Sequence, residues 1–453
     1  MYNNMWYVSG LLLLLYCLPL ISAKPAKGIP KAGNNIQTDE DWGYVNVRED
    51  AYMFWWLYYS TSEPYSAAPL VLWLQGGPGG SSCGFGNFEE IGPLDVELNP
   101  RNTTWISAAN VLFIDNPVGA GYSYVKNTSA LTKNNEEIAN DLVTTISAFF
   151  KKLPKFQDIP FYIFSESYGG KMTAGFSKAL LKAIELGRVT CNFQGFAMGD
   201  SWISPVDSTM TWGPYLYATS LLDHKGFVAV NQSATKTKEA FDAGNFTKST
   251  LLWSVTEEVI DKHTNGVNFY NILQWNGESP KRRKSFAFEK LSYLDKLFQR
   301  HVQPLQSDDL AALMNGPIKE KLGIPDDVTW GGQSDEVFEA LKEDFMKPVI
   351  DIVDDLVTNS DLSVVVYNGQ LDLIVDTMGT ERWVQKLTWP GLREYNNKTW
   401  TPLCVESAPE TTAAFVKTLD NFSFYWILDA GHMIPSDQGE VALKMMKMVI
   451  GAK

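Results

Sequence analysis

The sequence predicts an α/β protein with a mostly parallel central sheet flanked by helices. Several short, continuous runs of Val, Ile, Leu, Phe and Tyr end abruptly in turn residues, which is typical of strands buried on both faces. Helical periodicity lies between some of these runs. Residue types able to carry chemistry follow the runs directly, and doubly wound sheets gather their sites at that carboxyl edge.

Six runs are interpreted as strands of this sheet. In chain order they are Leu70–Leu74, Val111–Ile114, Phe161–Phe164, Phe193–Met198, Ser363–Tyr367 and Phe422–Leu428. Helical patterns occur at Glu136–Lys151 and Lys171–Leu186.

Residues 205–345 break this alternation. They are richer in Lys, Asp and Glu, and they carry helical patterns such as Leu291–Phe298 and Asp335–Phe345. The sequence therefore predicts a mostly helical cap inserted between two parts of one core, residues 24–204 and 346–453. The cap contains Lys281–Lys284, interpreted as an exposed basic loop or, alternatively, as a processing site.

The first 23 residues are expected to be a secretory signal peptide. An apolar run at 11–20 is too short to span a bilayer, and Ile21 and Ala23 suit signal-peptidase cleavage. An uncleaved anchor is the alternative interpretation. We expect the mature protein to be soluble and to follow the secretory pathway to a lysosomal or extracellular destination.

Composition excludes several classes of function. The net charge of −14 and the lack of a basic stripe argue against nucleic acid and anionic membranes as partners. Once Cys17 leaves with the signal, Cys83, Cys191 and Cys404 allow at most one disulfide, of undetermined pairing. The sequence has no CxxC or Cys/His cluster, so we expect no metal and no cofactor. Glycosylation sequons occur at Asn102, Asn127, Asn231, Asn245, Asn397 and Asn421.

The strongest motif is a candidate nucleophile at Ser167. The run from Phe161 leads through a tight turn into a helical pattern, as in the nucleophile elbow of α/β hydrolases. Such a turn needs small neighbours, because the serine sits in a strained conformation. Gly169 meets the G-x-S-x-G pattern, whereas Ser165 replaces its first glycine.

Two later residues complete a candidate triad. In α/β hydrolases the acid and then the histidine follow the serine along the chain. Asp372 follows the strand ending at Tyr367, and His432 follows the last strand. Asp376 is the rival acid. The other histidines fall in the predicted insertion: His224, His263 and His301.

A glycine-rich loop follows the earliest predicted strand. Residues 75–82 read QGGPGGSS, where this fold places the loop that stabilises an oxyanion. Glycine lets the main chain approach a substrate closely. A phosphate-binding loop fits less well, because no Lys-Ser/Thr follows the glycines. A plain tight turn is the remaining interpretation.

Five ordered blocks together resemble the serine carboxypeptidases, and they cover most of the mature chain. The blocks are WLQGGPGGSS (73–82), DNPVGAGYSY (115–124), FSESYGGK (164–171), NGQLDLIVD (368–376) and AGHMIPSDQ (430–438). The resemblance implies an α/β-hydrolase fold with a helical cap, and release of single residues from peptide C-termini.

The resemblance also implies roles for individual residues. It makes Ser167 the nucleophile, His432 the general base and Asp372 its orienting acid. It implies an oxyanion hole formed by the N–H groups of Gly77 and Tyr168. The substrate's free carboxylate would be held by residues from two segments: Gln75, Gly76, Glu90 and Glu166.

Three positions depart from the family pattern. Gln75 replaces an Asn, which keeps the amide but adds a methylene. Gly80 stands where a disulfide cysteine is usual, and Gln370 replaces an Asp. None of these changes removes a member of the candidate triad, and the first bears on how tightly the substrate's carboxylate is held.

Three functions are compatible with these residues. The leading one is a carboxypeptidase acting at acidic pH on the C-termini of peptides or proteins. A second keeps the triad but transfers acyl groups or hydrolyses another bond, as related plant proteins do on this scaffold. A third is a binding or stabilising protein with little catalysis. The sequence does not specify the oligomeric state or the preferred side chains.

Overall fold

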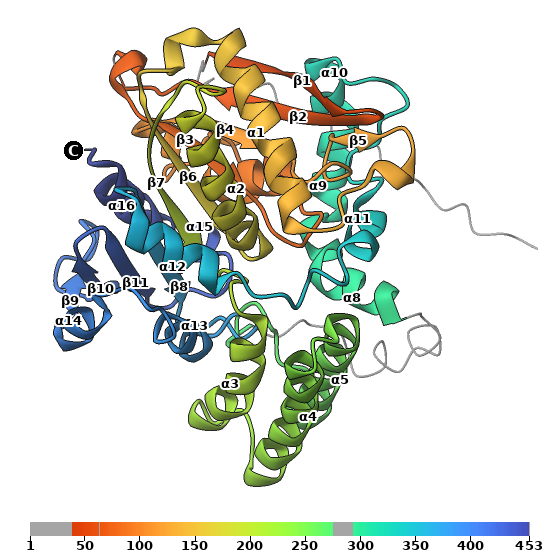
Figure 1. The fold of residues 1–453 in the computed structure, drawn as a ribbon, viewed down its shortest axis with the longest axis vertical. Coiled ribbons are helices and arrows are strands. Elements are labelled where there is room, and N and C mark those ends of the chain that lie inside the picture. The colour runs from red at the N-terminus through yellow and green to blue at the C-terminus, as the bar shows by residue number, and fades with distance from the viewer. Residues whose placement is uncertain (1–38, 63, 275–292, 453) are drawn as a thin grey trace, which may run out of the picture. The chain divides into compact units, whose positions relative to one another are not determined.

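The computed structural model of the chain describes residues 39–62, 64–274 and 293–452. The expected signal peptide at 1–23 and the basic loop Lys281–Lys284 lie outside the described residues. An 11-stranded sheet runs through the described part in the order β1-β2-β4-β3-β6-β7-β8-β11-β10-β9, with β5 paired to β2 (Figure 1).

Its strands are β1 (Glu40–Arg48), β2 (Ala51–Tyr58), β3 (Leu70–Leu74), β4 (Asn110–Ile114), β5 (Tyr124–Val125), β6 (Pro160–Glu166), β7 (Asn192–Gly199), β8 (Ser363–Gly369), β9 (Thr401–Leu403), β10 (Ala414–Leu419) and β11 (Phe422–Ile427).

The six strands from β4 to β11 pair in parallel, and they are the six strands that the sequence predicts. The outer strands β1, β2, β9 and β10 pair antiparallel with their neighbours. The predicted α/β-hydrolase fold is confirmed in its central feature, a mostly parallel sheet between helices.

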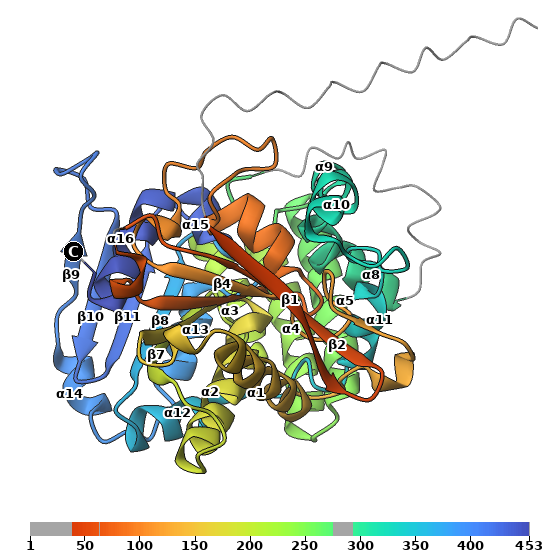
Figure 2. The same ribbon diagram turned by 90° about the horizontal axis from the view of Figure 1, so that it is seen from above.

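Helices cover both faces of the sheet (Figure 2). α1 (Asn135–Lys152), α2 (Tyr168–Glu185) and α12 (Ile350–Asn359) lie on one face, and α16 (Gly439–Ile450) lies on the other. The strands supply alternate residues to the two cores, as period-2 geometry requires. In β3, for example, Leu72 packs toward the α1–α2 side and Trp73 packs into the opposite core.

Shorter elements complete the described core. They are α13 (Thr377–Val384), α14 (Leu392–Asn397), α15 (Ile434–Asp437), a π-helical segment (Ser82–Ile91) and 3-10 turns at Tyr65–Ala67, Trp105–Ser107, Thr128–Ala130 and Pro154–Phe156.

Between β7 and α12 the described residues form two helical groups. The first is α3 (Pro205–Ala218), α4 (His224–Asp242) and α5 (Phe246–Thr264). The second consists of α8 (Tyr293–His301), a 3-10 turn (Gln303–Leu305), α9 (Asp308–Leu313), a π-helical segment (Met314–Ile318), α10 (Lys319–Leu322) and α11 (Ser334–Ala340).

In the second group α10 lies beside β1 and β2, whereas α8 lies next to α5 (Figure 1). The Trp42 indole N–H in β1 donates to the Leu322 carbonyl at 2.9 Å, and Lys321 pairs with Glu40 at 2.6 Å. Leu305 and Trp330 from this group share a core with Trp73 of the central sheet. The second group therefore packs against the sheet, and its α8 also joins α5 of the first group, because Arg300 pairs with Glu257 and Asp261. No helix in the described ranges is long and apolar enough to cross a bilayer.

Candidate active site

Ser167 occupies the turn between β6 and α2. Its backbone has φ 61° and ψ −130°, a conformation that non-glycine residues adopt only under constraint. The Ser167 N–H donates to the Gly199 carbonyl at 3.0 Å, and its own carbonyl accepts from the Trp202 N–H at 2.9 Å. These bonds to the β7 end hold the strained turn in place.

Small residues surround the turn because larger ones would not fit. A Cβ on Gly169 would lie 2.4 Å from the Leu74 carbonyl oxygen, and one on Gly170 would lie 2.0 Å from the Ser201 hydroxyl. Ser165, in place of the motif's first glycine, is buried and donates its hydroxyl to the Ala197 carbonyl at 3.3 Å. A serine is thus accommodated within the sheet at that position.

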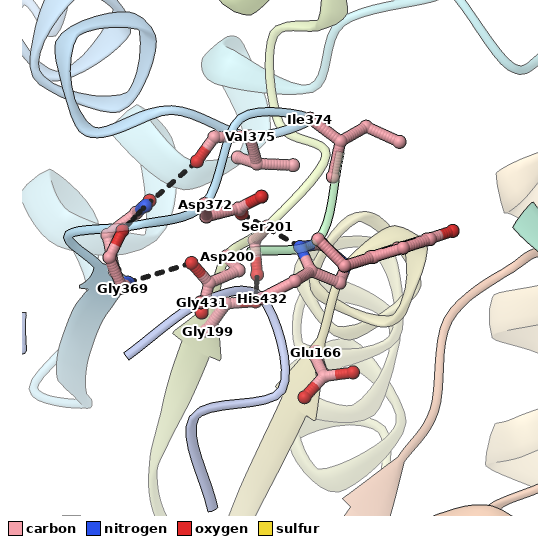
Figure 3. Close-up of polar contacts among 12 residues, drawn as sticks. Glu166, Gly199, Asp200, Ser201, Gly369, Asp372, Ile374, Val375, Gly431 and His432 are labelled. Carbon is pink, nitrogen blue, oxygen red and sulfur yellow. Dashed lines mark hydrogen bonds and ion pairs between the residues drawn. The ribbon is translucent and has the colours of Figure 1, made fainter. Parts of the chain in front are cut away.

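His432 and Asp372 lie together at the carboxyl edge of the sheet (Figure 3). The His432 Nδ1 is 2.8 Å from Asp372 Oδ2, and both side chains are buried. The main chain of His432 donates to the Tyr270 carbonyl at 2.7 Å, and the two rings lie 5.0 Å apart. Tyr270, which precedes the undescribed segment, therefore holds the histidine from the insertion side.

The rival acid Asp376 has another role. It caps α13 by accepting from the Gly379 N–H at 3.0 Å, and its second oxygen accepts from the Thr211 hydroxyl at 2.8 Å. Burial raises the pKa of Asp376 to about 8. Of the other histidines, His301 ends α8 and contacts the Tyr270 hydroxyl through Nδ1 at 3.1 Å. His224 and His263 lie on α4 and α5.

The glycine-rich loop passes directly against the serine. A Cβ on Gly76 would lie 2.5 Å from Ser167 Cβ and 2.9 Å from the Tyr168 nitrogen. Gly77 has φ 112°, which favours glycine. Tyr168 begins α2, so its N–H has no intrahelical acceptor. The glycine-rich loop and the start of α2 thus both present peptide groups close to Ser167.

A buried cluster of two carboxyls and an amide adjoins the same turn. Gln75 donates its Nε2 to Glu166 Oε1 at 2.7 Å and accepts from the Trp73 indole at 2.8 Å. Glu90, on the π-helical segment, interacts with both Glu166 and Gln75. Burial, and next the charge of Glu166, raise the pKa of Glu90 well above its usual range. Burial also raises the pKa of Glu166.

Two buried acids so close together cannot both ionise cheaply, so they retain a proton between them. The two Glu90 oxygens are buried and have no N–H or O–H donor within hydrogen-bonding geometry in the described part of the chain. A proton shared with Glu166 gives Glu90 a hydrogen bond that two ionised groups could not make. Such a pair can donate a hydrogen bond to an anionic ligand.

The departures from the family pattern have local explanations. A Cβ at Gly80 would lie 2.8 Å from Leu305 Cδ1, so a larger residue would displace the insertion. The Gln370 amide oxygen accepts from the Asp429 N–H at 3.3 Å. Cys83, Cys191 and Cys404 carry free thiols in the structure.

Sequence reasoning missed Asp200. It follows β7, just beyond Gly199, and its Oδ1 accepts from the Gly369 N–H at 2.8 Å (Figure 3). Ligand atoms of Asp200, Asp372 and His432 all lie within 4.8 Å of one another. The position of Asp200 directly after a predicted parallel strand could have identified it as a candidate site residue.

The sequons differ in accessibility. Four asparagines are exposed: Asn102, Asn127, Asn245 and Asn397. Asn231 lies half-buried in α4, and the half-buried Asn421 donates its side-chain amide to the carbonyls of Val357, Ser360 and Leu362.

The fold and the grouped residues define a serine hydrolase of the α/β-hydrolase type. A family model described as serine carboxypeptidase matches residues 30–452. The chain therefore belongs to the serine carboxypeptidase family.

Individual relatives agree with this assignment. The chain is 57% identical over 413 residues to the retinoid-inducible serine carboxypeptidase of Rattus norvegicus, covering 90% of this chain and 91% of the relative. The corresponding human protein is 55% identical over 413 residues, with the same coverage. Serine carboxypeptidase-like 51 of Arabidopsis thaliana is 42% identical over 450 residues, covering 96% of each. The residues GDSWISP (199–205), together with the region around His432, predict a likeness to this retinoid-inducible branch, and these identities confirm it.

A solved structure supports the fold. The crystal structure of Kex1(delta)p, a prohormone-processing carboxypeptidase from Saccharomyces cerevisiae, has a TM-score of 0.77 at 20% identity, covering 91% of each chain.

Proposed function

We propose that this protein is a serine carboxypeptidase that releases C-terminal amino acids from peptides at acidic pH, through an acyl-enzyme on Ser167. The observation that carries the proposal is the Gln75–Glu166–Glu90 cluster, which adjoins the candidate nucleophile directly in sequence and in space. A general hydrolase has no need of a protonated carboxyl pair there. A peptide's C-terminal carboxylate is the anion that such a pair can bind.

In this mechanism the Ser167 hydroxyl attacks the scissile carbonyl, and His432 accepts its proton at Nε2. Asp372 keeps the other ring nitrogen of His432 protonated and oriented at 2.8 Å. The N–H groups of Gly77 and Tyr168 stabilise the oxyanion of the tetrahedral intermediate.

Collapse of that intermediate breaks the C–N bond, and His432 returns its proton to the leaving amine. The C-terminal amino acid departs and leaves an ester on Ser167. Water, deprotonated by His432, then hydrolyses the ester and restores the serine hydroxyl.

The substrate's free carboxylate is held by Gln75, the Gly76 N–H, Glu90 and Glu166. Because Gln75 and Glu166 are already hydrogen-bonded to each other, the site is organised before substrate arrives. It places the last peptide bond, rather than an internal one, beside Ser167.

We also propose that the protein follows the secretory pathway to a lysosomal or extracellular destination, after removal of residues 1–23. Its partners would be peptide or protein C-termini. The exposed sequons Asn102, Asn127, Asn245 and Asn397 are the proposed glycosylation sites. Asn421 and Asn231 are poorer acceptors, because one amide is engaged in three hydrogen bonds and the other side chain is half-buried in a helix.

The test is release of the C-terminal residue from an N-blocked dipeptide between pH 4 and 8, with labelling by a fluorophosphonate as a parallel readout. We expect both activities in the wild type and neither in Ser167→Ala, with a loss of about a thousandfold or more. Ser165→Ala, which removes the neighbouring buried hydroxyl, is the matched control and should retain both. Labelling without dipeptide cleavage would favour acyl transfer or another hydrolysis. Absence of labelling in the folded wild type would favour the binding-protein alternative.

A further inference from the structure

Asp200 is a buried carboxyl behind the candidate triad that the mechanism above does not use. Its position is fixed, because its N–H donates to the Tyr367 carbonyl at 2.9 Å while Oδ1 accepts from the Gly369 N–H at 2.8 Å. Both bonds reach β8, the strand that leads to Asp372. Figure 3 shows the Asp200 carboxyl beside Asp372 and His432.

The remaining carboxyl oxygens of Asp200 and Asp372 both lack a hydrogen-bond donor among the described residues. Asp200 Oδ2 and Asp372 Oδ1 are both buried, and neither has an N–H or O–H donor in the described part of the chain. A buried carboxylate oxygen without a donor is costly. One proton placed between the two carboxyls removes both deficits, since the protonated acid donates and the ionised acid accepts.

We propose that Asp200 is a positioning residue that holds a proton and donates it to the free oxygen of Asp372, so that the triad's acid is a proton-sharing pair of carboxyls. This inference rests on the proposed function. Asp372 then accepts from His432 through Oδ2 and from Asp200 through Oδ1, and its carboxylate plane is fixed at both ends. The pair carries one negative charge rather than two beside the imidazole.

The surroundings favour the protonated form of Asp200. Burial, and next the charge of Asp372, raise the pKa of Asp200 well above its ordinary value. The groups that face the pair are predominantly acids and phenols, with His432 as the basic member of the set: Glu166, Tyr367, Asp376, Tyr215, Tyr270 and His432.

A cation is a poorer explanation of the cluster. Asp200, Asp372 and His432 lie close enough together to ligate one. However, the His432 nitrogen that faces the acids is 2.8 Å from Asp372 Oδ2, a distance at which Nδ1–H donates to the carboxylate. While Nδ1 carries this proton, it has no lone pair with which to bind a metal ion.

A shared proton has a consequence for pH dependence. One negative charge attracts the protonated imidazole less strongly than two would. The neutral base is therefore available at lower pH, where a peptidase of an acidic compartment works. As pH rises through the raised pKa of Asp200, the proton is lost, the two carboxylates repel, and the orientation of Asp372 is weakened.

The experiment compares Asp200→Asn and Asp200→Ala with the full-length wild type. The first readout is the pH dependence of the labelling rate with a fluorophosphonate, which has no carboxylate and so does not report on Glu90 and Glu166. The second is NMR titration of the 15N-labelled His432 imidazole, assigned with His432→Gln, which requires no activity. A failure of peptide cleavage would therefore leave both readouts interpretable.

Asn reproduces a protonated Asp200, because its Oδ1 accepts from Gly369 and its Nδ2 donates to Asp372. We expect Asp200→Asn to keep the wild-type labelling rate at acidic pH and the acidic side of its pH profile, and to leave the NMR titration of His432 unchanged. At higher pH, labelling of this variant should persist where that of the wild type declines. Asp200→Ala removes both hydrogen bonds, so labelling should slow about tenfold or more at every pH.

Two outcomes would overturn the proposal. If Asp200 is ionised in the working enzyme, Asp200→Asn removes a charge near the imidazolium and lowers the His432 pKa by about one to three pH units. Equal loss of labelling in folded Asp200→Asn and Asp200→Ala would likewise show that the carboxylate form is required.

Discussion

The side-chain amide of Gln75 links Trp73 in the central sheet to the buried Glu90–Glu166 pair. Its oxygen accepts from the Trp73 indole and its nitrogen donates to Glu166, at 2.8 and 2.7 Å. The longer side chain is therefore suited to its surroundings, although it departs from the family pattern. A residue one methylene shorter cannot keep both bonds without moving the backbone.

We therefore expect Gln75→Asn to raise KM for a blocked dipeptide about tenfold, while kcat changes little. The substrate's free carboxylate lies away from the carbonyl that Ser167 attacks. The lost interaction should therefore weaken the binding of substrate and transition state equally. Steady-state kinetics measure this directly. Gln194→Asn, which shortens an exposed glutamine in β7, is the control. A large fall in kcat at constant KM would place Gln75 at the transition state instead.

Glu166→Gln tests the shared proton of the carboxylate site. Because the pKa values of Glu90 and Glu166 are raised, the proton is present at acidic pH and lost as pH climbs. In the wild type KM should thus rise at alkaline pH, because the ionised Glu90 and Glu166 then repel the carboxylate of the substrate. An amide donates at every pH, so Glu166→Gln should flatten that limb.

Amidated peptides provide the control within the wild type, because they lack the carboxylate and should show little of the alkaline limb. KM profiles from pH 4 to 8 measure both effects. Identical profiles for acids and amides would remove the carboxylate-binding role from this pair.

At the scale of elements, α2 is joined to the segment that follows α11 by a buried ion pair. Lys171 lies 2.6 Å from Asp344, whose carboxylate also accepts from the Tyr168 hydroxyl at 2.7 Å. Phe345 stacks on Tyr168 with centroids 6.1 Å apart, and its carbonyl accepts from the Trp202 indole at 2.9 Å. The start of α2, beside the candidate nucleophile, thus depends on residues from the end of the insertion.

Lys171→Met should destabilise the fold by about 3–5 kcal/mol, because it leaves the Asp344 charge buried without its partner. The double variant Lys171→Met/Asp344→Leu should recover much of that loss. Urea unfolding measures both. Lys178→Met in the same helix breaks an exposed pair with Asp355 and should cost less than about 1 kcal/mol. Equal effects of Lys171→Met and Lys178→Met would contradict the role of the buried pair.

The sequence predicts the strands that carry the site better than those that border it. β3, β6, β7, β8 and β11 are continuous apolar runs followed by motif residues, and each is found where expected. β2 is as apolar as they are, but a run of eight such residues does not distinguish a strand from a buried helix. β1 is half-buried along its length, and β9 and β10 are partly exposed, so none forms a continuous apolar run.

Within the site, the sequence predicts residues that belong to motifs and misses those that depend on register. Ser167, Asp372 and His432 each follow a recognisable strand. Asp200 also follows one, but its place beside Asp372 depends on how β7 pairs with β8. The link between Lys171 and Asp344 spans 173 positions, and periodicity carries no information over that distance.

At the scale of the whole molecule, buried acids make stability depend on pH. Burial raises the pKa of Asp115 to about 6 and that of Asp376 to about 8, and the pKa values of Glu90, Glu166 and Asp200 are raised as well. A folded-state pKa above the unfolded one stabilises the protein below the unfolded value, and this stabilisation is lost as pH rises through the folded value. The protein should therefore be most stable in acid.

We expect the melting temperature to fall by about 5 °C or more between pH 5 and 8, as followed by circular dichroism. Asp376→Asn, whose amide can still accept from Gly379 and donate to Thr211, should reduce this fall by removing one of the groups responsible. A melting temperature that rises across this interval would show that these acids are ionised in the folded protein at pH 5.

The close packing of Trp330 on Gly84 also constrains how related sequences diverge. A Cβ at Gly84 would lie 2.3 Å from the indole of Trp330, nearly 250 positions away in the chain, and the same indole donates to the Ser81 hydroxyl at 3.0 Å. In any lineage a side chain could be gained at position 84 only together with a smaller residue at 330. Substitutions at these two positions should therefore be inherited as a pair, whereas α4, which packs chiefly on α3 and α5, is free to vary without that coupling.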